Sequence, residues 1–138
     1  RQAVLFGVEQ VAHRAVHRVL LDGLADRLVL NRHRELGERA RAAGVTLLNQ
    51  AVLLKDINDS VAVQTALNQR LFAAGVLPYY LHVLDKVAGA AHFDSDVGAA
   101  IALYWSLLAV LPGYLVPKLV RELPNKPFKV PIDIYNDA

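Results

Sequence analysis

Polar side chains interrupt or close two apolar runs in the middle of the chain. Asn49 and Gln50 interrupt the first run, and His82 and Asp85 close the second. In parallel α/β folds the chemistry lies at the carboxyl ends of strands, because loops there vary over a rigid base. The amide, imidazole and carboxylate groups therefore predict a polar site at one edge of a sheet. The alternatives are a buried, hydrogen-bonded amide for Gln50, a core histidine for His82 and a capping residue for Asp85.

Lys129 lies among prolines in the loop from Glu122 to Pro131. A lysine becomes a neutral nucleophile when its surroundings exclude water, so a lysine in a loop that folds over a pocket is suited to imine formation. The residues alone favour a solvated surface lysine at position 129.

Two groups of basic residues precede these candidates. His13 and His17 are four residues apart, so one helix face could hold a metal ion between them, but the glutamate of the zinc-protease pattern is missing. We favour an exposed polar stripe there and predict no metal site. Arginines and a histidine gather again at residues 32–41, where a solvated helix face is favoured over a phosphate or acidic-partner site.

The composition argues against several classes of protein. The net charge is only +2, from 15 basic and 13 acidic residues, and aromatic residues make up 7%, so we expect no nucleic-acid partner. Without cysteine, this chain supplies no disulfide, thiolate zinc site or iron–sulfur cluster. The longest apolar stretch, Ala99 to Leu111, is shorter than the roughly 20 residues that span a bilayer, so we expect a buried helix and no membrane partner.

The 138 residues are enough for one core. Hydrophobic residues make up 54% and the mean hydropathy is +0.29, so the chain must bury segments on two faces or leave apolar surface for a partner. The amino terminus lacks a signal-peptide pattern, and we expect a cytoplasmic protein. Because the sequence starts at an arginine and holds no methionine, we also expect a piece of a longer protein.

The hydrophobic pattern predicts an alternation of strands and helices. Asp59 or Ser60 caps one helix, Gly44 and Gly75 each end one, and Pro78 suits the start of a strand. We expect helices at 8–24, 34–43, 60–74 and 94–111, strands at 27–31, 45–54, 76–82 and 114–120, loops at 85–93 and 122–131, and a tail from 132 that could add an edge strand.

This alternation predicts an α/β fold with parallel strands joined by right-handed crossovers. Near-continuous apolar strands indicate burial on both faces. A complete (β/α)₈ barrel needs roughly 250 residues. We therefore expect a single α/β domain over residues 1–138 that forms half of a TIM-type barrel, with an open sheet as the alternative.

Three segments, GVTLLNQAVLLKDIND, AGVLPYYLHVLDKVAGAAHF and LPGYLVPKLVRE, are followed by a lysine flanked by prolines. Together they closely resemble the carboxyl-terminal half of the lysine 2,3-aminomutase family. The nearest branch resembles the one that isomerises lysine for attachment to elongation factor P. The resemblance covers residues 44–132 in the family's order and intervals, whereas residues 1–43 match poorly.

The resemblance implies a radical S-adenosylmethionine isomerase on a barrel, with a [4Fe–4S] cluster and pyridoxal phosphate. In that family the cluster cleaves S-adenosylmethionine to a 5′-deoxyadenosyl radical. The radical takes a hydrogen from lysine held as an aldimine on pyridoxal phosphate, and the amino group moves from C2 to C3. The substrate expected here is L-lysine or a small amino acid.

The resemblance also implies roles for individual residues. Lys129 matches the lysine that binds pyridoxal phosphate as an imine, and His82 an aromatic position beside the pyridoxal ring. Asp85 and Glu122 match acids that bind the distal ammonium of the substrate. Gln50 matches a residue that contacts S-adenosylmethionine.

The chain departs from the family in three places. The CxxxCxxC cluster motif is missing, and the His-x-Asn-His stretch is reduced to Asn31-Arg32-His33. The Ser-Lys-Thr-Pro context of the imine lysine reads Phe128-Lys129-Val130-Pro131, which removes two hydroxyls. We therefore expect the carboxyl-terminal part of an aminomutase-like enzyme, inactive by itself for lack of the cluster motif.

Two other functions remain as alternatives. A non-catalytic half-barrel would self-associate into a homo-oligomer, because its exposed strand edges need pairing or covering. Nucleic-acid binding through residues 32–41 is the weakest alternative, and it predicts a steep loss of affinity with salt.

Overall fold

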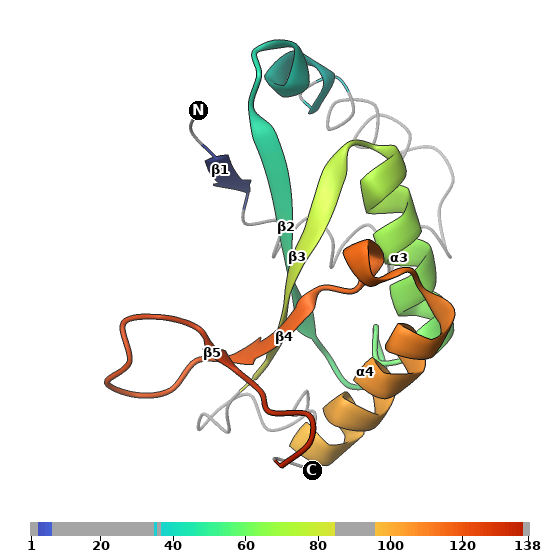
Figure 1. The fold of residues 1–138 in the computed structure, drawn as a ribbon, viewed down its shortest axis with the longest axis vertical. Coiled ribbons are helices and arrows are strands. Elements are labelled where there is room, and N and C mark those ends of the chain that lie inside the picture. The colour runs from blue at the N-terminus through green and yellow to red at the C-terminus, as the bar shows by residue number, and fades with distance from the viewer. Residues whose placement is uncertain (1–2, 7–34, 36, 85–95, 137–138) are drawn as a thin grey trace.

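The computed structural model describes residues 3–6, 35, 37–84 and 96–136. Over these residues the chain is a mixed α/β structure, in which one sheet of five strands packs against helices (Figure 1). The predicted helix at 8–24 and the predicted strand at 27–31 lie outside the described residues. His13, His17 and Asp85 lie outside them as well.

The five strands lie side by side in chain order. Each of the first four is parallel to its neighbour, and the last is antiparallel. Figure 1 shows the two long helices on the same side of the sheet, as right-handed crossovers between successive parallel strands require. The strands are β1 (Ala3–Phe6), β2 (Thr46–Leu53), β3 (Val76–Val83), β4 (Lys118–Arg121) and β5 (Val130–Pro131).

The hydrophobic core lies between this sheet and the helices α3 (Val61–Ala73) and α4 (Val97–Val110). Along β2 every second residue from Leu47 to Leu53 is buried, and the residues between are partly exposed. A period of two sends alternate side chains to opposite faces, so one face of β2 seals the core. The sheet contributes Ala51, Leu53, Leu81, Val83 and Leu119 to this core, and α4 contributes Ala100, Ile101, Leu103 and Leu107.

Three predicted helix boundaries are confirmed. Ser60 is the N-cap of α3, and its hydroxyl accepts a hydrogen bond from the amide of Val63 at 3.3 Å. Gly75 follows α3 with φ +78°, the left-handed conformation that glycine adopts without steric cost. Gly44, at φ +73°, likewise follows helical residues at 37–42.

The strand predicted at 114–120 is wrong in its first half. Gly113–Leu115 form a 3₁₀ turn, and β4 begins only at Lys118. Pro117 stands directly before β4 and has no N–H to donate to the sheet, so pairing starts one residue later. The apolar run continues through the turn because Leu115 packs into the core.

The two edges of the sheet also differ from the prediction. β1 was not expected, because its four residues are too few to show a period. At the other edge, β5 is Val130–Pro131, within the expected loop and before the tail at 132. It runs antiparallel to β4, whereas the predicted strands were parallel.

Candidate functional site

A β-bulge in β3 decides which side chains share a face with Gln50. The pairing of β2 with β3 skips Tyr79, so β3 carries one extra residue there. The extra residue shifts the alternation by one, and this places His82 on the face of Gln50 instead of in the core. Pro78, predicted at the start of a strand, lies inside β3 next to this bulge, where a missing N–H disrupts the ladder least.

Gln50 and His82 are joined by a hydrogen bond. The Nε2–H of His82 donates to the Oε1 of Gln50 at 3.2 Å. His82 lies opposite Val52, two residues beyond Gln50 along β2, so the contact runs diagonally across two strands. The imidazole is buried, with 6% of the residue exposed. A buried imidazole with a polar partner keeps a fixed orientation.

Glu122 and Lys129 form an ion pair next to these residues. Glu122 directly follows β4 and Lys129 directly precedes β5, and the antiparallel pairing of those strands brings the two residues together. The ammonium of Lys129 donates to the Oε1 of Glu122 at 2.7 Å. This hydrogen bond and the charge of Lys129 lower the pKa of Glu122, with a smaller contribution from His82. Glu122 is therefore within electrostatic reach of the imidazole.

Tyr80, which the sequence did not single out, lies beside His82, and Tyr79 and Lys118 lie next to Tyr80. The ring of Tyr80 meets the imidazole edge-on, with ring centres 5.9 Å apart, and the hydrogen bond that the Tyr80 hydroxyl shares with Tyr79 raises the pKa of Tyr80. The ammonium of Lys118 lies 5.0 Å from the centre of the Tyr79 ring, a cation–π distance. Tyr80 and His82 are two residues apart and share a face of β3. The sequence alone does not show which face this is, because that depends on the position of the bulge.

The loop after β2 is held by the side chain of Asn58. Its Oδ1 accepts from the amide of Leu54 at 2.7 Å, and its Nδ2 donates to the carbonyl of Val52 at 2.8 Å. The Nε2 of Gln64, from α3, donates to the backbone carbonyl of Asn58 at 2.8 Å. These bonds tie the carboxyl end of β2 to α3, which fixes the backbone on which Gln50 stands.

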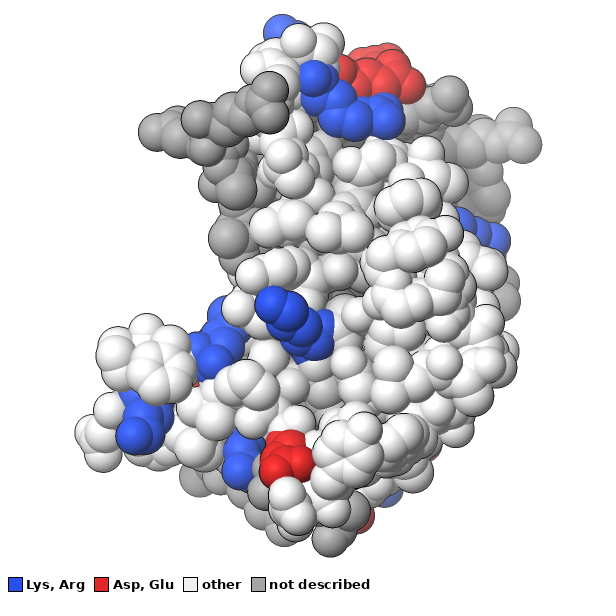
Figure 2. Space-filling view, in the orientation of Figure 1, with Lys and Arg blue, Asp and Glu red and all other residues white. Residues whose placement is uncertain are grey.

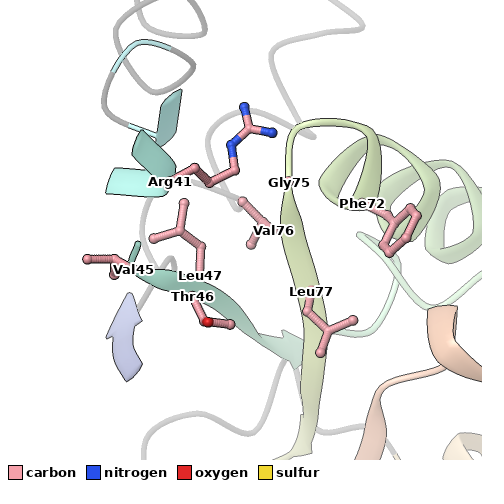
Figure 3. Close-up of a pocket in the computed structure, with 8 residues that line it drawn as sticks. All are labelled: Arg41, Val45, Thr46, Leu47, Phe72, Gly75, Val76 and Leu77. Carbon is pink, nitrogen blue, oxygen red and sulfur yellow. The ribbon is translucent and has the colours of Figure 1, made fainter. Parts of the chain in front are cut away.

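A separate cavity of about 330 Å³ lies at the amino ends of β2 and β3 (Figure 3). Most of its lining is apolar, with the guanidinium of Arg41 at its rim. The nearest lining residue on β3 is Leu77, five residues before His82, or roughly 16 Å along the strand. The cavity is lined by Arg41, Val45, Thr46, Leu47, Phe72, Gly75, Val76 and Leu77. It does not include the residues of the predicted site.

The charged surface is unevenly distributed. Figure 2 shows Lys and Arg side chains around β4 and β5, whereas the surface over α3 and α4 in the same view is broad and mostly uncharged. Within the described residues, no group of three His, Cys, Asp or Glu side chains could hold a metal ion. No helix in that part of the chain is long and apolar enough to cross a membrane.

The structure thus brings four of the five predicted site residues together. Gln50 and His82 lie in the carboxyl-terminal halves of β2 and β3, on the face opposite α3 and α4, Glu122 directly follows β4, and Lys129 is paired with it just before the antiparallel β5. The fifth, Asp85, is outside the described residues. The arrangement offers an amine, a carboxylate, an imidazole and an amide to a small polar ligand.

Comparison with known proteins assigns the chain to a family. It is 52% identical to the L-lysine 2,3-aminomutase of Escherichia coli over 101 residues, which are 73% of this chain. It is 49% identical to the L-lysine 2,3-aminomutase of Haemophilus influenzae over 67% of this chain. The chain belongs to the lysine 2,3-aminomutase family. The glutamate 2,3-aminomutase of Clostridioides difficile is 34% identical over 72% of this chain, and no family model matches.

The chain spans less than a third of the relatives that it matches. The aligned part covers 30% of the Escherichia coli lysine 2,3-aminomutase and 27% of the Haemophilus influenzae protein. In both, the match is to the carboxyl-terminal part, as the sequence predicted. The chain therefore corresponds to the carboxyl-terminal part of these relatives.

Proposed function

We propose that this chain is the carboxyl-terminal part of a lysine 2,3-aminomutase-like enzyme and supplies the side of the active site that holds pyridoxal phosphate and the amino-acid substrate. The whole enzyme would move the amino group of lysine from C2 to C3. The observation that carries the proposal is the row of Gln50, His82, Glu122 and Lys129 on one face of the sheet. These are the residues to which the family resemblance assigns contacts with S-adenosylmethionine, pyridoxal phosphate and the substrate.

The described residues fit pyridoxal phosphate. Lys129 is a primary amine with 26% of its side chain exposed, so it is partly shielded yet reachable. Glu122 holds the Lys129 ammonium at a defined point. His82 offers a flat ring in a fixed orientation for the pyridine ring to lie against. When bound, pyridoxal phosphate supplies an aldehyde carbon and an electron-withdrawing ring.

The sign of the charge favours lysine over glutamate as the substrate. Once Lys129 no longer carries a proton, the carboxylate of Glu122 is left to pair with another cation. The distal ammonium of lysine meets that need, whereas the distal carboxylate of glutamate would be repelled at the same place. The name of the Clostridioides difficile relative shows that glutamate is an alternative substrate in such proteins.

Gln50 would face S-adenosylmethionine, to which its amide can donate and accept hydrogen bonds. A [4Fe–4S] cluster does not fit this chain, because the chain contains no cysteine. The cluster ligands would come from the part of the enzyme that precedes this chain. We assign no step of the reaction in this chain to the cluster.

The fold that we propose is the closing half of a TIM-type barrel. Four parallel strands in chain order, with helices on one face, match the wall of such a barrel. In a doubly wound sheet the strand order would reverse at a switch point. The row from Gln50 to Glu122 steps two residues further along each successive strand, as tilted barrel strands place neighbouring side chains.

Reductive trapping tests the proposed function. The purified chain is incubated with pyridoxal phosphate, reduced with borohydride and mapped by mass spectrometry. We expect most of the label on Lys129 and its loss in Lys129→Met. Lys126→Met, in the same loop, is the matched control and should leave the labelling unchanged. Label spread evenly over the surface lysines would refute the proposal.

A second function, a non-catalytic half-barrel that self-associates, is favoured by the exposed aromatic side chains. Trp105 and Tyr135 meet edge to face with ring centres 5.3 Å apart, and these residues are 42% and 75% exposed. Phe72 and Tyr114 form a similar exposed pair, with ring centres 5.2 Å apart. Exposed aromatic surface and open strand edges both favour association. A monomer at all concentrations in analytical ultracentrifugation would exclude this function.

A further inference from the structure

Gln50, His82, Glu122 and Lys129 are connected in sequence across three adjacent strands and the following loop. The first contact is the 3.2 Å hydrogen bond between His82 and Gln50. The second is proximity in the sheet, because Glu122 lies two residues beyond Val120, the partner of His82 on β4, and His82 makes a small contribution to the lowered pKa of Glu122. The third is the 2.7 Å ion pair between Glu122 and Lys129. The orientation or charge of each group therefore affects the next group.

We propose that Gln50 is a positioning residue, which sets the tautomer and orientation of His82 and through it the Glu122–Lys129 pair. A ligand that binds to the Gln50 amide would then change the surroundings of the Lys129 amine. This inference rests on the proposed function for the identity of the two ligands, S-adenosylmethionine at Gln50 and pyridoxal phosphate at Lys129. The contacts themselves belong to the chain without ligands.

The hydrogen bond between Gln50 and His82 can select either of the two neutral tautomers of His82. The Oε1 of Gln50 can only accept a hydrogen bond, so Nε2 of the neutral His82 ring must carry the proton and Nδ1 becomes an acceptor. If a ligand turns the amide by half a turn, its NH₂ group meets Nε2 instead. The ring must then carry its proton on Nδ1, which reverses donor and acceptor on the side away from Gln50.

Burial makes the first half of this connection stronger than the second. His82 is 6% exposed, and its hydrogen bond to Gln50 is shielded from water. The side chain of Glu122 is 73% exposed, so its link to His82 and Lys129 is weakened by solvent. The tautomer of His82 should therefore respond to Gln50 more strongly than the acid–amine pair does.

Nitrogen NMR of the imidazole in the ligand-free chain tests the positioning role. In the wild type we expect neutral His82 to carry its proton on Nε2. In Gln50→Leu we expect a mixture of two neutral tautomers, one with the proton on Nε2 and one with the proton on Nδ1. Gln50→Glu keeps an acceptor and should restore the wild-type tautomer. Gln69→Leu makes the same change at an exposed site on α3 and is the control. An unchanged tautomer in Gln50→Leu would overturn the proposal.

Carbon NMR of the Glu122 carboxylate tests the rest of the connection without any cofactor. In Gln50→Leu the pKa of Glu122 should rise toward its ordinary value, because His82 is no longer held beside it. The amount of pyridoxal phosphate trapped on Lys129 should then differ roughly fivefold between Gln50→Leu and the wild type. An unchanged Glu122 titration shows that the connection stops at His82 and overturns its second half. A wild-type chain that traps no pyridoxal phosphate refutes the proposed function alone, since both NMR results stand without it.

Discussion

The two faces of the sheet have opposite characters, although the same strands build both. Toward α3 and α4, the side chains of β2, β3 and β4 are mostly aliphatic and enter a closed core, with the buried amide of Asn49 on β2 as an exception. On the other face, adjacent strands present an amide, an imidazole and, just past β4, a carboxylate. The stability of the fold therefore depends on one face, and the proposed chemistry depends on the other. Substitutions on the two faces should have separable effects.

The bulge at Tyr79 is the point at which the two faces depend on each other. Inserting an alanine between Tyr80 and Leu81 would shift the alternation by one residue, turn His82 toward the helices and turn Leu81 and Val83 away from them. We expect a loss of about 3 to 6 kcal/mol, enough to abolish cooperative folding, because two core side chains leave their contacts. Thermal and urea unfolding followed by circular dichroism measure this.

Tyr79→Ala is the control for the insertion, because it keeps the number of residues in β3 and removes only the ring. It should cost about 1 kcal/mol or less, mainly the contact with the Lys118 ammonium. If the insertion and the substitution are equally mild, the alternation that follows the bulge does not decide which residues face the core.

Leu107 tests the core face alone. Its side chain is fully buried, at 0% exposure, in the centre of the core that α4 shares with the sheet. Leu107→Ala should destabilise the fold by about 3 to 5 kcal/mol through lost burial and the cavity left behind. Urea unfolding measures the difference. Leu108→Ala, at a neighbouring residue that is 38% exposed, should cost far less. Equal losses at the two positions would mean that α4 is buried on both sides.

Local signals predicted the framework of the fold well. Ser60, Gly44 and Gly75 end or begin helices for reasons contained in a few neighbouring residues, and all three are confirmed. The buried strands were found because their apolar runs are longer than chance and bounded by glycine. The mixed α/β class follows from that alternation.

Features that depend on distant pairing were not predictable. The bulge at Tyr79 exists only relative to β2, and β1 is too short to be recognised without its partner. Lys118 and Tyr80 become neighbours of His82 through the register of three strands. The proximity of the predicted site residues was expected from their positions at strand ends, but their order from Gln50 to Lys129 required the structure.

The ion pair of Glu122 and Lys129 tests the other face. Because the pKa of Glu122 is lowered in the fold, its stabilising effect is present above its unfolded pKa and is lost as the pH falls through its folded pKa. With 73% of the Glu122 side chain exposed, we expect Glu122→Gln to cost less than about 1 kcal/mol at neutral pH. Urea unfolding at neutral and acidic pH should show this difference vanishing at acidic pH. A larger or pH-independent loss would show that Glu122 is structural.

Asp56, in the loop after β2, should give the smallest effect and the opposite sign. Its φ is +60°, a conformation that costs energy for any residue with a side chain and little for glycine. Asp56→Gly should therefore be neutral or stabilise the fold by up to about 0.5 kcal/mol, with Asp59→Gly, a nearby exposed acid in the same loop, as the destabilising control. Thermal unfolding resolves the difference. Because Asn58 already holds this loop through three hydrogen bonds, the carboxylate of Asp56 is not needed to support β2. A clear loss of stability in Asp56→Gly would show that this carboxylate, and not only the hydrogen bonds of Asn58, holds the loop and the backbone next to Gln50.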